Sequence, residues 1–441
     1  MRSVTVVGTG YLGATHAACL AELGFDVLGM DVDEVKIAAL SAGRVPFYEP
    51  ALAELVAKHV ASGKLRFTTS YAEVAAFADL HFLCAGTPQR IGELAADLSQ
   101  VDGAFGGLAR HLDRPCLLVG KSTVPVGTAA RLADLVATTA PAGAAAELAW
   151  NPEFLREGHA VADTLRPDRL VVGVRGTRAE EVLREVYADL LAAGVPFLVT
   201  DFATAELVKV AANAFLATKI SFINAMAEVC QAAGGDVTAL ADALGHDPRI
   251  GRRFLNAGLG FGGGCLPKDI RAFMARAGEL GVSEALTFLR EVDAINLRQR
   301  ARAVEISREL CDGVLVGRRI AVLGAAFKPE SDDVRDSPAL DVAGQLQLSG
   351  ARVSVFDPKA MANAAARFPT LSYAESAEDA CADADLVLHL TEWQAFRDLD
   401  PAKLAEVVAR PVVLDARNAL DQVAWRAAGW IYRGFGRSTT N

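Results

Sequence analysis

Hydrophobic positions in the first 200 residues form short runs that are separated by longer amphipathic stretches. The runs predict strands, and the Ala- and Leu-rich stretches between them predict helices. The first unit is a strand over residues 3–7, a helix over 11–23 that Gly24 ends, and a strand over 25–30. Further strands are predicted at residues 80–85, 115–119, 148–150 and 170–174. This alternation predicts an α/β fold with a mostly parallel, doubly wound sheet through about residue 200.

The pattern changes in the middle of the chain. From Thr204 to about Ala233 apolar residues recur at helical spacing without Pro or Gly, which predicts one long helix. Helical segments continue to about Cys311, and the strand pattern then returns at residues 319–324, 352–357 and 385–390. We therefore predict two Rossmann-like doubly wound domains joined by a long central helix, with segment boundaries at 1–200, 201–312 and 313–441. In the second copy, polar residues 326–337 replace a glycine turn.

Composition narrows the class of protein. The net charge is −10, and no basic face is evident, which disfavours nucleic-acid binding. The 7 cysteines are scattered without a C-x-x-C pair, which disfavours a disulfide framework and a metal site and favours a reducing cytoplasm. Residues 4–21 are uncharged and resemble a signal peptide, but cleavage there would remove the glycine motif described next. Since no other apolar run is long enough for a bilayer, we expect neither export nor membrane anchoring.

A glycine motif follows the first predicted strand and opens the first helix. Gly8, Gly10 and Gly13 have the G-x-G-x-x-G spacing, and Asp31 ends the next strand. In this context the first glycine permits a tight turn, the second admits a pyrophosphate and the third lets the helix pack closely. A carboxylate at Asp31 suits the ribose hydroxyls and repels a 2′-phosphate, so the motif predicts NAD as cofactor. Lys36, one turn further on, could reach the same ribose or remain a solvated lysine.

A second pattern surrounds one cysteine. Gly260 and the glycines of 262–264 lead into Cys265, with Lys268 and Asp269 just beyond. A helix N-terminus and a nearby ammonium favour the thiolate, which is the nucleophilic form of cysteine. The other cysteines lie among Ala, Leu and Val, which is typical of buried core residues.

Polar residues also occur where apolar ones are expected. Lys209 and Asn213 have i, i+4 spacing on one face of the long helix. Segments 121–128 and 151–158 follow predicted strands, and ligands of open α/β sheets bind at the carboxyl ends of strands. Ordinary turn and capping chemistry is the alternative for both segments.

Together these residues resemble the UDP-glucose/GDP-mannose dehydrogenase family over nearly the whole chain. The resemblance rests on motifs at 8–13, 86–88, 121–128, 151–158, 209–213, 261–269 and 327–335. It implies two Rossmann-like domains, a homodimer built on the long helix, and UDP-glucose as substrate. It also implies four-electron oxidation of the primary alcohol of the sugar to a carboxylate, with two NAD used in sequence. Gly264 stands where the family has Ser or Tyr, and Leu12 where Val is common.

The resemblance also implies roles for individual residues. Cys265 is the expected nucleophile, first as a thiohemiacetal and then as a thioester. Lys209 and Asn213 are expected to support the hydroxyl and oxyanion, Asp269 to assist proton transfer, and Glu153 and Thr123 to hold a water. The expected cofactor-binding residues are Gly8, Gly10, Leu12, Gly13, Asp31, Lys36, Thr87, Thr123, Glu157, Lys268 and Arg335. The expected substrate-binding residues are Glu153, Phe154, Leu155, Arg156, Glu157, Lys209, Asn213, Phe254, Leu255, Asn256, Ala257, Gly258, Gly262 and Lys328, with Arg249 reaching the site of a neighbouring subunit.

Three alternatives remain at this stage. Dehydrogenation of GDP-mannose or UDP-N-acetylmannosamine would use the same thiol chemistry. A β-hydroxyacid dehydrogenase also pairs a Rossmann domain with a Lys-x-x-x-Asn helix, but the cysteine loop and the second α/β domain disfavour it. A catalytically silent sensor of nucleotide sugars would bind NAD and UDP-glucose without producing NADH.

Overall fold

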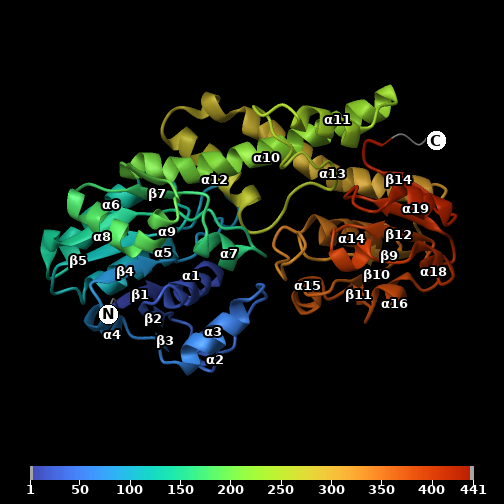
Figure 1. Ribbon diagram of the computed structural model, residues 1–441. Coiled ribbons are helices and arrows are strands. Elements are labelled where there is room, and N and C mark those ends of the chain that lie inside the picture. The colour runs from blue at the N-terminus through green and yellow to red at the C-terminus, as the bar shows by residue number, and fades with distance from the viewer. Residues whose placement is uncertain (1–2, 438–441) are drawn as a thin grey trace. The chain divides into compact units, whose positions relative to one another are not determined.

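The computed structural model describes residues 3–437, which form two compact units with one sheet each (Figure 1). The first unit comprises residues up to 212 together with 271–281, and the second comprises 213–270 together with the chain from 282 onward. Helices α10 (Phe202–Ala233) and α12 (Leu266–Glu279) contribute residues to both units. The three segments expected from the sequence divide the chain differently, and that division stays a prediction.

The first sheet has eight strands in the order β3-β2-β1-β4-β5-β6-β7-β8 within the described residues. Neighbouring strands run parallel except β6 and β7, which meet antiparallel at Trp150 and Gly173. The sequence missed the two edge strands, β3 and β8. Each has only four residues and at most one buried position, so neither forms an apolar run. The strands are β1 (Ser3–Val7), β2 (Asp26–Met30), β3 (Leu65–Thr68), β4 (Leu80–Leu83), β5 (Cys116–Gly120), β6 (Ala146–Trp150), β7 (Leu170–Gly173) and β8 (Phe197–Thr200).

Successive side chains of the central strands point to opposite faces of the sheet, so this unit has a buried core on each face. In β5, Leu117 and Val119 belong to one buried cluster, and Cys116 and Leu118 belong to the other. The first cluster includes side chains of the helices α1 (Tyr11–Glu22), α3 (Leu52–Ala61) and α8 (Thr177–Val186). The second cluster includes side chains of the helices α4 (Tyr71–Phe77), α5 (Ser99–Ala109) and α6 (Thr128–Thr139). Helices therefore cover both faces, as a doubly wound sheet requires.

The second unit repeats this plan with six parallel strands in the order β11-β10-β9-β12-β13-β14. The order matches the first six strands of the other sheet, so the predicted fold class, with two Rossmann-like sheets and a long central helix, is confirmed. The strands are β9 (Arg319–Leu323), β10 (Arg352–Phe356), β11 (Ser372–Tyr373), β12 (Leu386–His389), β13 (Val412–Asp415) and β14 (Ile431–Gly434).

The helices account for most of the remaining described residues. They are α1 (Tyr11–Glu22), α2 (Glu34–Ser41), α3 (Leu52–Ala61), α4 (Tyr71–Phe77), α5 (Ser99–Ala109), α6 (Thr128–Thr139), α7 (Ala160–Leu165), α8 (Thr177–Val186), α9 (Ala188–Ala192), α10, α11 (Val237–Gly245), α12, α13 (Phe288–Leu310), α14 (Pro338–Leu348), α15 (Met361–Arg367), α16 (Ala377–Cys381), α17 (Gln394–Arg397), α18 (Pro401–Ala405) and α19 (Gln422–Ala427), with short 3-10 helices at Gly143–Ala145 and Ser283–Leu286.

The 32-residue helix α10 requires a correction to the membrane argument. Its length and mean hydropathy are sufficient to cross a bilayer, whereas the sequence was expected to contain no such segment outside the N-terminus. Length and hydropathy do not separate a spanning helix from the core helix of a folded domain. In α10 the side chains of Ala205, Ala217 and Ile223 are fully buried within the protein, which is typical of a core helix.

Candidate active site

The glycine motif forms a tight turn between β1 and α1. Gly8 has φ +87°, and its N–H donates to the carbonyl oxygen of Met30 at 2.7 Å. A Cβ on Gly13 would lie 1.8 Å from the carbonyl oxygen of Gly8, so the helix begins in direct contact with the turn. Gly10 is the N-cap of α1, where no side chain of the described residues caps the helix or lies within 4 Å of the Cβ position. An open, uncapped helix N-terminus fits the pyrophosphate of a dinucleotide.

Asp31 lies directly after β2, beside this turn. Its Oδ2 accepts the backbone N–H of Thr9 at 2.9 Å and the ammonium of Lys36 at 2.8 Å. Burial favours the neutral acid, but the hydrogen bonds from Lys36 and from backbone N–H groups outweigh it, so the pKa of Asp31 lies below its ordinary value. The charged carboxylate is thus held at the position where a ribose would meet it.

A buried acid that the sequence analysis did not select lies behind the turn. Glu49 accepts the hydroxyl of Tyr11 and the backbone N–H groups of Gly158 and Ala160, the latter two both at 2.7 Å. Burial and the adjacent Glu49 raise the pKa of Tyr11 well above its usual range. Glu49 therefore ties the glycine turn to the end of the 151–158 segment. Its position inside an irregular segment gave no periodic signal.

Predicted residues after β4 and β5 contact each other, and the predicted residue after β6 contacts α10. The hydroxyl of Thr87 donates to the carbonyl oxygen of Thr123 at 2.9 Å. Glu153 forms an ion pair with Lys209 at 3.1 Å, and both side chains are nearly buried. The Lys209 ammonium also lies 5.5 Å from the centre of the Phe154 ring. A shielded carboxylate after a strand and a shielded ammonium on the facing helix can hold a hydroxyl or a water and exchange protons with it.

In the second unit, Cys265 immediately precedes α12. It is exposed, whereas the other six cysteines, all within the described residues, are buried as the sequence predicted. Burial raises the pKa of those other thiols, to about 12 in Cys84 and Cys381. Cys265 is therefore the thiol that a substrate can reach.

Three polar side chains meet one turn into α12. The carboxylate of Asp269 accepts the Asn213 amide at 2.7 Å and lies 2.5 Å from the Lys268 ammonium. Asp269 and Asn213 are buried, and Lys268 is partly exposed. Asn213 is one turn beyond Lys209 on α10. This helix therefore carries Lys209, which pairs with Glu153, and Asn213, which bonds to Asp269.

The glycine run before Cys265 is tightly packed. A Cβ on Gly262 would lie 2.3 Å from the Asp336 carbonyl oxygen, and one on Gly264 would lie 2.4 Å from the guanidinium carbon of Arg335. Arg335 is itself paired with Asp333 at 2.6 Å. The glycine at 264 thus leaves room for the Arg335 guanidinium.

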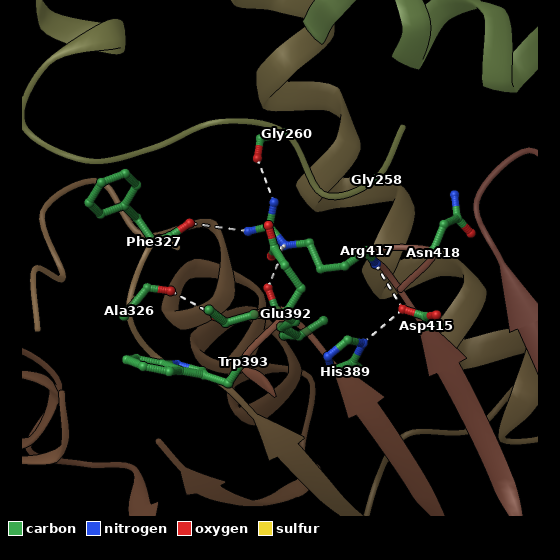
Figure 2. A network of polar contacts seen from close by, with 12 residues as sticks. Gly258, Gly260, Ala326, Phe327, His389, Glu392, Trp393, Asp415, Arg417 and Asn418 are labelled. Atoms are coloured by element: carbon green, nitrogen blue, oxygen red, sulfur yellow. Dashed lines mark hydrogen bonds and ion pairs between the residues drawn. The ribbon is translucent and has the colours of Figure 1, made fainter. Parts of the chain in front are cut away.

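Arg417 connects this run to the second sheet, and the sequence analysis missed it (Figure 2). Its guanidinium donates to the carbonyl oxygens of Gly260 at 2.9 Å and Phe327 at 3.3 Å. Its own backbone N–H donates to Asp415, the buried last residue of β13. A basic residue shortly after an aspartate at the end of a strand is a signal that the sequence contains twice, at Asp31 with Lys36 and at Asp415 with Arg417. The second instance was missed because β13 was not among the predicted strands.

Hydrogen bonds with two asparagines hold the segment 254–258, which is predicted to bind the substrate. Asn224 accepts the N–H of Gly258 at 2.8 Å, and Asn418 donates to the Ala257 carbonyl at 3.1 Å. Phe254 has φ +66°, a strained conformation for an aromatic residue.

Other predicted site residues contact residues that are close to them in the sequence. Arg249 is exposed and paired with Asp247 at 2.6 Å, and Arg156 is paired with Asp163 at 2.6 Å. Lys328 lies 5.6 Å from the ring of its neighbour Phe327. Leu155 donates its N–H to Glu153, and Leu12 lies in the first turn of α1. The roles proposed for Asn256, Glu157 and these residues stay predictions.

Three family models match the chain in sequence order. They are the NAD binding domain of the UDP-glucose/GDP-mannose dehydrogenase family over residues 2–191, its central domain over 203–298 and its UDP binding domain over 321–422. A UDP-glucose 6-dehydrogenase of Rhizobium meliloti is 42% identical over 437 residues, 98% of this chain and 99% of that protein. UDP-glucose 6-dehydrogenase TuaD of Bacillus subtilis is 40% identical over 439 residues, 99% of this chain and 94% of that protein.

Solved structures agree with these matches. A UDP-glucose dehydrogenase from Pyrobaculum islandicum superposes with a TM-score of 0.91 at 39% identity, covering 99% of this chain and 98% of that one. A UDP-D-ManNAc dehydrogenase from Pyrococcus horikoshii superposes with a TM-score of 0.86 at 25% identity, with both chains fully covered. The sequence motifs, the two sheets and these matches establish that the chain belongs to the UDP-glucose/GDP-mannose dehydrogenase family and is an oxidoreductase that uses NAD.

Proposed function

We propose that this enzyme oxidises UDP-glucose to UDP-glucuronate, with Cys265 as a covalent nucleophile. The observation that carries the proposal is the exposed thiol at the start of α12, next to the Asp269, Lys268 and Asn213 cluster. Several relatives at about 40% identity over nearly their full length are named UDP-glucose 6-dehydrogenases. The structure named for UDP-D-ManNAc has lower identity, which favours UDP-glucose over that alternative.

The proposed reaction has two oxidations and one hydrolysis. Removal of a hydride and a proton converts the C6 alcohol to an aldehyde. The thiolate of Cys265 adds to the aldehyde carbon, and the resulting oxyanion takes up a proton to give a thiohemiacetal. Loss of a second hydride and a proton leaves a thioester, which water cleaves to the carboxylate and the free thiol. NAD, when bound, supplies the hydride acceptor for each oxidation.

The polar residues supply binding and proton transfer. Lys209 would hold the hydroxyl and the developing oxyanion, with Asn213 adding a neutral donor one turn further along α10. Glu153, already paired with Lys209, would orient the water together with Thr123. Asp269, held by Asn213, would assist proton transfer beside Cys265. Asp31 and the open turn at Gly10 would bind the ribose and pyrophosphate of NAD.

The stoichiometry of NADH tests this proposal. With excess NAD, about two NADH should form per UDP-glucose consumed, while GDP-mannose and UDP-N-acetylmannosamine in parallel reactions should give none. A yield of one would mean that the aldehyde is released and that Cys265 is not a nucleophile. If GDP-mannose or UDP-N-acetylmannosamine is oxidised instead, that sugar nucleotide is the substrate. If UDP-glucose and NAD bind but no NADH forms, the protein is a sensor.

A substitution tests the nucleophile directly. Cys265→Ser should form an ester that hydrolyses slowly, so intact-mass spectrometry should detect a substrate adduct. Cys230→Ala is the matched control, because it removes a buried thiol from the same unit and should leave turnover intact. Full turnover by Cys265→Ser without an adduct would exclude the covalent role.

We further propose a homodimer built on α10. Phe215, Phe222 and Val229 are exposed and lie at seven-residue intervals on this helix, so they form an apolar stripe. Light scattering should give twice the mass of 46.4 kDa, and Phe222→Asp should lower it. An unchanged mass for that variant would remove α10 from the interface. None of the seven cysteines, all of which lie within the described residues, forms a disulfide, and this supports a cytoplasmic location.

A further inference from the structure

A buried acid of the first unit has no part in the reaction as described. Glu206 lies on α10, three residues before Lys209, and is 2% exposed. Its two carboxylate oxygens accept the backbone N–H groups of Gly127 at 2.7 Å and Ala129 at 2.6 Å. These donors belong to the N-terminus of α6, so Glu206 caps a helix that is distant from it in the sequence.

The local sequence of α6 explains why an external cap is needed. The N-cap residue is Gly127, which has φ +97° and no side chain to accept the free N–H groups. A carboxylate also interacts favourably with the positive end of the helix dipole. Glu206 therefore satisfies two N–H groups at the start of α6, of which the one on Ala129 is buried and the one on Gly127 belongs to an exposed residue.

The segment 121–129, which carries Thr123, runs into the capped N-terminus of α6. At the other end of that segment, Ser122 donates to the Ala85 carbonyl at 2.6 Å, and Thr87 donates to the Thr123 carbonyl. Toward α6, Arg276 donates to the Val126 carbonyl at 2.9 Å. The segment is thus held at both ends, and Glu206 provides the bonds to the helix that carries Lys209.

We infer that Glu206 is a positioning residue, whose carboxylate fastens the 121–129 segment with Thr123 to the part of α10 that carries Lys209. The inference rests on the proposed function for its effect on turnover. Burial of this carboxylate is unfavourable by itself: burial raises the pKa of Glu206 to about 7, against the opposing effects of the two N–H donors and Arg276.

Two measurements on Glu206→Gln test the inference. The amide can accept from only one oxygen, so one of the two N–H groups loses its partner. Hydrogen–deuterium exchange of residues 121–129, measured without substrates, should become faster. With UDP-glucose and NAD, kcat should fall about tenfold, while the KM for UDP-glucose should change less than twofold.

Asp201→Ala is the matched control. Asp201 caps α10 itself, accepting the Thr204 N–H at 2.7 Å, and is exposed. Its loss should weaken the same helix but leave kcat and the exchange of 121–129 unchanged. If both variants lose kcat equally, or if Glu206→Gln leaves either kcat or the exchange unchanged, the inference is overturned.

A second variant keeps the test decisive if Glu206→Gln does not fold. Arg276→Met removes the bond to the Val126 carbonyl and should accelerate exchange of the same segment with a smaller loss of kcat, about threefold. Unchanged exchange and kcat in this variant would count against the inference. Absence of NADH production by the unmodified enzyme would instead refute the proposed function, while the exchange experiment would still decide whether Glu206 fastens the segment.

Discussion

The contact between Gly13 and Gly8 allows a quantitative test of the cofactor turn. A Cβ at Gly13 would lie 1.8 Å from the Gly8 carbonyl oxygen and 2.9 Å from its carbonyl carbon. Close C···O contacts in proteins are about 3.3 Å, so Gly13→Ala must separate the helix from the turn by about 1.5 Å. Both obstacles are backbone atoms, so rotation of a side chain cannot relieve the clash.

The displaced helix belongs to the core. Ala14, Ala17 and Ala18 of α1 are fully buried, so shifting this helix disturbs packing that is already dense. Overpacking typically costs about 1–3 kcal/mol, and we expect Gly13→Ala to lie at or above the upper end of this range. Hydrogen exchange of α1 in increasing urea, without NAD, measures this cost for the first unit alone.

Gly10→Ala is the matched control for the same motif. Nothing among the described residues lies within 4 Å of its Cβ position, and its φ of −68° suits alanine. The stability of α1 should therefore change by less than about 1 kcal/mol. Because the added methyl group faces the expected pyrophosphate, NAD affinity measured by calorimetry should fall at least tenfold. A Gly13→Ala variant as stable as the unmodified protein, or unchanged NAD affinity in Gly10→Ala, would refute the reasoning.

Three further predictions concern acids and backbone strain. Asp31→Ala should weaken NAD at least tenfold and leave UDP-glucose affinity unchanged in calorimetry; equal losses for both ligands would contradict the cofactor assignment. Glu206, with a pKa raised from 4.5 to about 7, binds more protons in the folded state than in the unfolded state. The stability of the protein relative to Glu206→Gln should therefore fall as pH rises from about 4.5 to about 7, by at most ~3 kcal/mol; a constant difference in urea unfolding would refute this. Ala51 has φ +64°, so Ala51→Gly should relieve strain and stabilise the first unit by up to ~1 kcal/mol. A lower urea midpoint for this variant would contradict that expectation.

Features set by neighbouring residues were accessible from the sequence. The glycine turn, the strand that ends directly before Asp31 and the long helix all depend on local spacing, and the structure places them where predicted. The same holds for the cysteines, because an apolar neighbourhood in the sequence was sufficient to separate six buried thiols from Cys265. The edge strands β3 and β8 were missed because exposed strands carry no apolar run.

Contacts between distant residues needed the tertiary structure. The Asp269–Asn213 bond joins residues that are 56 positions apart, and Glu206 reaches Gly127 across 79 positions. Arg417 contacts Gly260 across 157 positions, and neither residue indicates its partner. Hydropathy alone also made α10 comparable to a membrane helix, and its burial against the rest of the protein supplied the missing information.

Residues that are close together along the chain encode the glycine turn, the repeated α/β pattern and the polar, glycine-rich surroundings of the exposed Cys265, so the sequence was sufficient to predict them. The tertiary structure decided which buried acids hold those elements and which carbonyls the arginines contact. The physical reason is that hydrogen bonds and ion pairs act over a few ångströms in space, and the chain's topology alone determines which distant residues come within that range.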